Sequence, residues 1–150
     1  MDISILNKQR KYPLDMIQVR NWTRQVLLLQ KFENGEVNVI FVNNRRIRDY
    51  NRDYRKIDRA TDVLSFPMRE GFGGDLHPDF LGDVMISLEM TEVEAKSYAR
   101  EMDEQLLILL IHGILHLMGY DHEGSEAEEK KMIRRERFIL KKIQDRSRGI

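Results

Sequence analysis

The order of strand-like and helix-like segments predicts an α+β fold, in which a four-stranded mixed sheet is packed with about five helices. Short β-branched runs indicate the strands, and longer segments with apolar residues at helical spacing indicate the helices. One predicted helix is apolar almost all round yet carries His112 and His116, so we expect a buried helix that bears histidines. With 150 residues and 41% hydrophobic content, the chain has the size of a single domain over residues 1–150.

Two strands and two helices are expected in the first 61 residues. The first strand alternates Ile3 and Ile5 with polar residues, and the second is the β-branched run EVNVIFV. Pro13 suits the first turn of one helix, and Asn43 or Asn44 can cap the other, which is highly charged. The predicted elements are a strand over 2–6, a helix over 14–32, a strand over 36–42 and a helix from 45 to about 54.

The rest of the chain supplies two more strands and three more helices, with a Gly/Pro-rich loop over 67–81. Asp103 can cap the histidine-bearing helix, and Ser125 with Glu128 forms a capping box, S-x-x-E, for the last helix. The expected elements are strands over 62–66 and 82–87, and helices over 89–100, from 103 to 118, and from 126 to about 145.

Three of the four histidines, His112, His116 and His122, stand in the pattern H-x-x-x-H-x-x-G-x-x-H. Helical residues four apart share one face, about 6 Å apart along the axis, so the first two rings can converge on one ion. Gly119 can adopt a left-handed conformation that ends the helix and lets His122 return to that ion. Three imidazoles plus one water form a catalytic zinc arrangement, so we expect one Zn²⁺ per chain. The competing interpretation is a set of hydrogen-bonded core histidines.

The same spacing occurs in the metzincin proteases, H-E-x-x-H-x-x-G-x-x-H, and the expected metal cradle resembles theirs. In those proteases the glutamate is the general base that activates the metal-bound water. Gly113 stands at that position here and offers no side chain. The sequence therefore favours an electrophile other than the peptide bond, and a zinc-dependent protease is the alternative enzyme class.

Seven Lys or Arg residues lie within residues 45–59, against three Asp, although the net charge of the chain is zero. This segment is either a solvated helix face with internal ion pairs or a phosphate-binding surface, since a guanidinium can donate two hydrogen bonds to phosphate. Asp121 can orient a histidine ligand of the metal. Asp83 is a second candidate for that role, although it also reads as an ordinary strand-end carboxylate. His77, in the glycine-rich loop, is expected at the surface.

The absence of cysteine excludes disulfides and thiolate metal sites, which fits a reducing cytosol. The N-terminal segment MDISILNKQR has no apolar run of signal-peptide length, and the apolar run over 106–118 is too short to span a bilayer. We therefore expect a cytoplasmic protein with no membrane partner.

Three sequence blocks, taken in order, resemble the YbeY family, the bacterial single-strand-specific endoribonucleases of rRNA maturation. The histidine motif HGILHLMGYDH at 112–122 fits the family pattern H-G-x-L-H-L-x-G-Y-D-H and is highly specific. The other blocks are NRDYR at 51–55, followed by TDVLSFP at 61–67, and LGDV at 81–84. Together the blocks span roughly residues 51 to 122.

The resemblance implies a zinc-dependent nuclease that acts on single-stranded rRNA precursors near the 3′ end of 16S rRNA and in ribosome quality control. It implies RNA rather than DNA as the substrate, with the small ribosomal subunit and assembly factors as partners. It also implies that Arg55 is the family's functional arginine, so we expect Arg55 and the metal-holding His112 to act in catalysis. A further alternative is a non-catalytic assembly factor whose metal only supports the fold.

Overall fold

Nine elements make up the described parts of the chain, residues 1–68, 79–120 and 124–149 of a computed structural model. The strands are β1 (Asp2–Asn7), β2 (Glu36–Val42), β3 (Val63–Pro67) and β4 (Phe80–Ser87). The helices are α1 (Met16–Leu29), α2 (Asn44–Arg55), α3 (Leu88–Ser97), α4 (Met102–Leu117) and α5 (Glu126–Ser147). The predicted α+β class, with a four-stranded mixed sheet and five helices, is confirmed.

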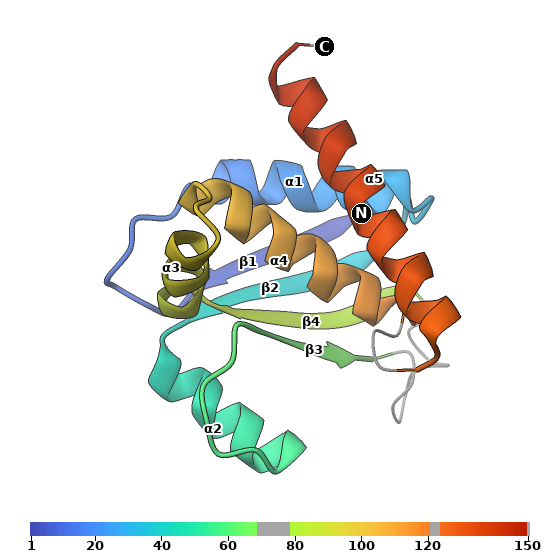
Figure 1. The fold of residues 1–150 in the computed structure, drawn as a ribbon. Coiled ribbons are helices and arrows are strands. Elements are labelled where there is room, and N and C mark those ends of the chain that lie inside the picture. Colours follow the sequence, from blue (N-terminus) through green and yellow to red (C-terminus); the bar gives the residue numbers. More distant parts are fainter. Residues whose placement is uncertain (69–78, 121–123, 150) are drawn as a thin grey trace.

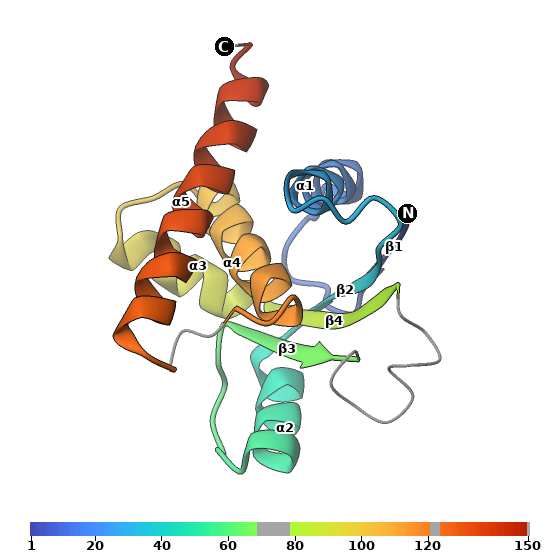
Figure 2. The ribbon, with the colours of Figure 1, turned by 90° about the vertical axis from the view of Figure 1, so that its right-hand side faces the viewer.

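The sheet has the strand order β1-β2-β4-β3, with three parallel strands and an antiparallel edge strand, β3 (Figure 1). Apolar side chains project from both faces of the sheet, and helices cover both faces. The larger core lies between the sheet and α1, α4 and α5, while α2 covers the opposite face with a smaller core (Figure 2). The helix α3 packs against α4 beside the end of β4.

The histidine-bearing helix α4 lies close against β3 and β4 because Gly113 carries no side chain. A Cβ atom at Gly113 would stand 2.6 Å from Cγ1 of Val84 and 3.1 Å from Cγ2 of Val63. The hydroxyl of Ser65 in β3 donates a hydrogen bond of 2.8 Å to the Gly113 carbonyl oxygen. The glycine thus sets how near α4, and with it the histidines, can approach the edge strand.

Gly119 ends α4 in the predicted left-handed conformation, with φ of +95°. Its amide donates to the His116 carbonyl oxygen at 3.1 Å, and the Tyr120 amide donates to the Leu115 carbonyl oxygen at 3.1 Å. These two bonds form a Schellman motif, which satisfies carbonyl groups that the helix end leaves unpaired. The chain therefore reverses directly after the second histidine.

Two of the three N-caps predicted from the sequence are present in the structure. The side chains of Asn43 and Ser125 accept hydrogen bonds from the backbone at the starts of α2 and α5. The cap predicted at Asp103 is wrong, because α4 starts two residues earlier: Glu101 is its N-cap residue and makes no side-chain cap hydrogen bond. Asp103 lies in the first turn, where its carboxylate interacts favourably with the positive end of the helix dipole.

Candidate functional site

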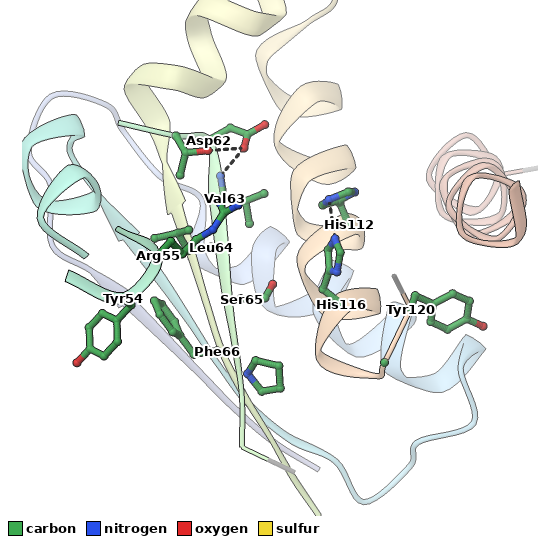
Figure 3. Close-up of a pocket in the computed structure, with 13 residues that line it drawn as sticks. Tyr54, Arg55, Asp62, Val63, Leu64, Ser65, Phe66, His112, His116 and Tyr120 are labelled. Atoms are coloured by element: carbon green, nitrogen blue, oxygen red, sulfur yellow. Dashed lines mark hydrogen bonds between the residues drawn. The ribbon is translucent and has the colours of Figure 1, made fainter. Parts of the chain in front are cut away.

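A cleft of about 850 Å³ opens between the end of α2, the edge strand β3 and the C-terminal half of α4. Residues 61–67 form its floor, Tyr54 and Arg55 line it from α2, and His112 and His116 line it from α4. Figure 3 shows the α2 residues and the imidazoles on opposite sides of β3. Two segments that the sequence analysis singled out, the arginine-rich helix and the histidine helix, thus meet at one cavity.

The two imidazoles on α4 converge at their Nε2 atoms. These atoms are 3.1 Å apart, and the ring planes are inclined by 71°. Two zinc–nitrogen bonds of about 2.1 Å at a tetrahedral angle place the nitrogens about 3.4 Å apart, so the pair fits one shared ion. A shared proton would also fit this separation. Among the described residues no group of three His, Cys, Asp or Glu side chains forms a metal site, and His122 lies outside those residues.

Glu136 holds the outer nitrogen of the first imidazole. Its Oε1 atom lies 2.7 Å from Nδ1 of His112, with both side chains about three-quarters buried. A carboxylate in this position accepts a hydrogen bond from Nδ1–H, which places the lone pair of His112 on Nε2, the atom that faces His116. The structure therefore has the carboxylate–histidine arrangement that accompanies metal-binding histidines in proteins.

Glu136 was not predicted from the sequence, because it lies in a basic run on α5 whose composition is typical of a solvated helix face. One sequence feature could have found it, since it is the only acidic residue between Lys130 and Gln144. The residue before it, Arg135, donates a 2.7 Å hydrogen bond to the Leu29 carbonyl oxygen of α1 and so helps to position α5.

Arg55 ends α2, directly before Lys56, whose left-handed backbone (φ +63°) turns the chain towards β3. The acids near it are engaged elsewhere: Arg48 pairs with Asp58 at 2.8 Å and lowers the pKa of that carboxyl. The other two acids of the segment, Asp49 and Asp53, pair with Arg52. Within the described parts of the chain Arg55 makes no ion pair, so its exposed guanidinium can meet an anion in the cleft. The arginine-rich segment is therefore divided between ion-paired and unpaired cations.

The family model described as "Endoribonuclease YbeY" matches residues 4–144 of the chain. The chain belongs to the YbeY family of endoribonucleases. Similar curated proteins carry the same name: that of Aquifex aeolicus is 39% identical over 139 residues, covering 93% of this chain and 91% of its own. That of Geobacter sulfurreducens is 40% identical over 141 residues, covering 93% and 94%. The resemblance expected from the three sequence blocks is confirmed.

A solved structure agrees with this assignment at the level of the fold. The solution structure of TM1509 from Thermotoga maritima has a TM-score of 0.67 and 27% sequence identity, and the match covers 98% of this chain and 92% of that one. As a YbeY endoribonuclease, the protein is a hydrolase that acts on RNA. No helix within the described residues combines the length and apolar character needed to cross a bilayer.

Other predicted site residues lie elsewhere in the fold. Asp83 lies on the α2 face of the sheet, beside Asn38, whose side-chain amide donates to it at 2.9 Å, and it does not line the cleft. Among the described residues, Glu136 rather than Asp83 contacts a predicted histidine ligand, His112. His122, Asp121 and His77 lie outside the described residues.

A second carboxyl group sits behind the cleft, on α3. Burial and the neighbouring Asp62, which lines the cleft, raise the pKa of Glu94 to about 7. The side-chain amide of Gln105 donates to Glu94 at 2.9 Å and partly opposes that shift. The Glu94 carboxyl therefore keeps its proton at pH values where an ordinary glutamate has already lost it.

Proposed function

We propose that this endoribonuclease cleaves unpaired segments of rRNA precursors near the 3′ end of 16S rRNA, with a zinc ion held by His112, His116 and His122. The observation that carries the proposal is the convergence of two Nε2 atoms at 3.1 Å, with Glu136 behind one of them. The same cleft holds Arg55, an anion-binding group suited to phosphate.

A zinc ion at this site would supply Lewis-acid chemistry at the scissile phosphate. The protein groups have separate tasks. Glu136 accepts a hydrogen bond from Nδ1 of His112 and so keeps the proton on that nitrogen. Arg55 neutralises the negative charge that develops on the non-bridging phosphate oxygens. Either a water molecule or the 2′-hydroxyl of the RNA attacks the phosphorus, and the products distinguish the two routes. A 5′-phosphate indicates attack by water, and a 2′,3′-cyclic phosphate indicates internal attack.

The zinc protease is the weaker alternative for a steric reason as well as a chemical one. A protease base at residue 113 would need a side chain where the Cβ position already lies 2.6 Å from Val84. The non-catalytic assembly factor is disfavoured by the open cleft in front of the imidazoles, since structural zinc sites are closed by four protein ligands. The small ribosomal subunit, assembly factors and a cytoplasmic location belong to the proposal.

The test is incubation of purified protein with a single-stranded RNA and with the same sequence as a duplex, each with and without a chelator. We expect endonucleolytic cleavage of the single strand, loss of cleavage with chelator and recovery on adding zinc. Cleavage that survives complete metal removal would overturn the metal-dependent mechanism. Chelator-sensitive digestion of casein, without RNA cleavage, would favour the protease.

A further inference from the structure

Tyr54 is an aromatic side chain on the wall of the cleft, one residue before Arg55. It is 67% exposed, and it lines the same cavity as the two imidazoles. Two other rings surround it: Tyr50 is stacked at 5.9 Å between centroids with planes 11° apart, and Phe66 of β3 meets it edge-on at 5.5 Å. Figure 3 shows Tyr54 and Phe66 together on the α2 side of the cleft.

The cluster fixes the Tyr54 ring without covering it. Tyr50 and Phe66, themselves 6.1 Å apart, are both half-buried and pack against the small core under the sheet. An aromatic pair four residues apart on a helix is a common stabilising contact, which would account for the Tyr50–Tyr54 stacking alone. It does not account for an ordered ring that is mostly exposed to water and lines the same cavity as Arg55.

We propose that Tyr54 is a stacking platform for one unpaired nucleobase of the RNA, next to the phosphate that Arg55 binds. The inference rests on the proposed function only in taking RNA as the occupant of the cleft. Aromatic rings bind bases of single strands by stacking, and a ring held by its neighbours loses little conformational freedom when a base is bound. The adjacent guanidinium supplies the phosphate contact of the same nucleotide step.

Such a platform selects single strands for a physical reason. Both faces of a base inside a duplex are already stacked on its neighbours, so the base must leave the helix before it can meet Tyr54. An unpaired base reaches the ring at no such cost. Tyr54 would thus be a specificity-determining residue for strandedness, while Arg55 contacts a phosphate that both forms present.

The experiment measures binding of a short fluorescent single-stranded RNA, and of its duplex, by anisotropy, together with single-turnover cleavage. Tyr54→Ala removes the ring, Tyr54→Leu keeps apolar bulk without a π face, and Tyr54→Phe keeps the ring and checks that the fold tolerates substitution. Tyr98→Ala is the matched control, since Tyr98 is 61% exposed on the end of α3 and does not line the cleft.

We expect Tyr54→Ala and Tyr54→Leu to bind the single strand roughly tenfold to a hundredfold more weakly, the range for one base–aromatic stack. Tyr54→Phe and Tyr98→Ala should stay within about twofold of the parent, and duplex binding should not change in any variant. Removing the stacked base, as one abasic position in the RNA, should weaken binding by the parent as much as Tyr54→Ala does. Tyr54→Ala should then cause no further loss of affinity for the abasic RNA.

Single-strand affinity of Tyr54→Ala within twofold of the parent, or equal losses for single strand and duplex, overturns the platform. Because binding is read separately from cleavage, the outcomes for the two proposals are distinguishable. A parent that cleaves RNA with an unaffected Tyr54→Ala leaves the nuclease and removes the platform. If the parent binds single-stranded RNA without cleaving it, and Tyr54→Ala still weakens binding, the platform stands and the nuclease proposal fails.

Discussion

Replacing Glu136 tests whether the carboxylate behind His112 tunes metal binding. A hydrogen bond to a charged group contributes about 1.5–3 kcal/mol, and a neutral one about 0.5–1.5 kcal/mol. The 2.7 Å contact is about three-quarters buried on both sides, so solvent screens it only in part. Glu136→Gln keeps an acceptor but loses the charge, which should weaken zinc binding by about 1–1.5 kcal/mol, or roughly tenfold. Glu136→Ala removes the acceptor and should cost up to about a hundredfold.

The assay is competition for zinc against a chromophoric chelator at equilibrium, with helix content checked by circular dichroism. Glu126→Gln is the control on the same helix, because Glu126 is 83% exposed and pairs with Lys130 in water. Its zinc affinity should equal that of the parent. A folded Glu136→Ala that binds zinc within twofold of the parent would refute the reasoning.

Three further predictions concern packing, catalysis and titration. Gly113→Glu should destabilise the fold by more than about 3 kcal/mol in urea unfolding, because its Cβ would collide with Val84 and its charge would be buried; near-parent stability would contradict this. Arg55→Ala should slow single-turnover RNA cleavage a few hundred-fold, about 3–4 kcal/mol, with Tm and metal content unchanged and Arg55→Lys recovering part; a loss under threefold would contradict the role. The pKa of Glu94 is raised from 4.5 to about 7, so the parent should lose stability as pH rises through that window. Glu94→Gln should gain about 1 kcal/mol relative to the parent between pH 5 and pH 8, a figure discounted for partial exposure, and a pH-independent difference would contradict this.

The sequence predicted the fold well where local chemistry decides it. Strand β2 has the expected bounds, and the glycine at the end of α4 and the caps at Asn43 and Ser125 act as their residue types require. Helix ends were less well predicted: α1 spans Met16–Leu29 rather than 14–32, because Asp15, not Pro13, begins it and Lys31 takes a left-handed backbone. Such ends depend on which of several permissible residues the tertiary packing selects.

The site was predictable where it follows helical spacing and not where it depends on how elements cross. Two histidines four apart must share a face, so His112 and His116 converge whatever surrounds them. Asp83 lies on the sheet face away from α4, and the sequence could not show this because β4 is buried on both faces and lacks a clear apolar–polar alternation. Glu136 could not be predicted, because it reaches His112 only through the packing of α5 against α4.

Gly113 shows how one residue can be read correctly in its chemistry and incompletely in its structural role. In the sequence it marks the absence of a protease base. In the structure it is also a point of tight contact between α4 and the sheet, with its carbonyl oxygen accepting a hydrogen bond from Ser65. Both roles favour glycine, and the packing role applies whatever the substrate is.

The central claim is that His112, His116 and His122 hold one metal ion, and the most direct measurement is elemental analysis of freshly purified protein. The parent should contain about one zinc-class ion per chain. His116→Ala should lose most of it, whereas His77→Ala, which replaces the remaining histidine, should retain it. Metal content in folded His116→Ala equal to that of the parent would contradict the account.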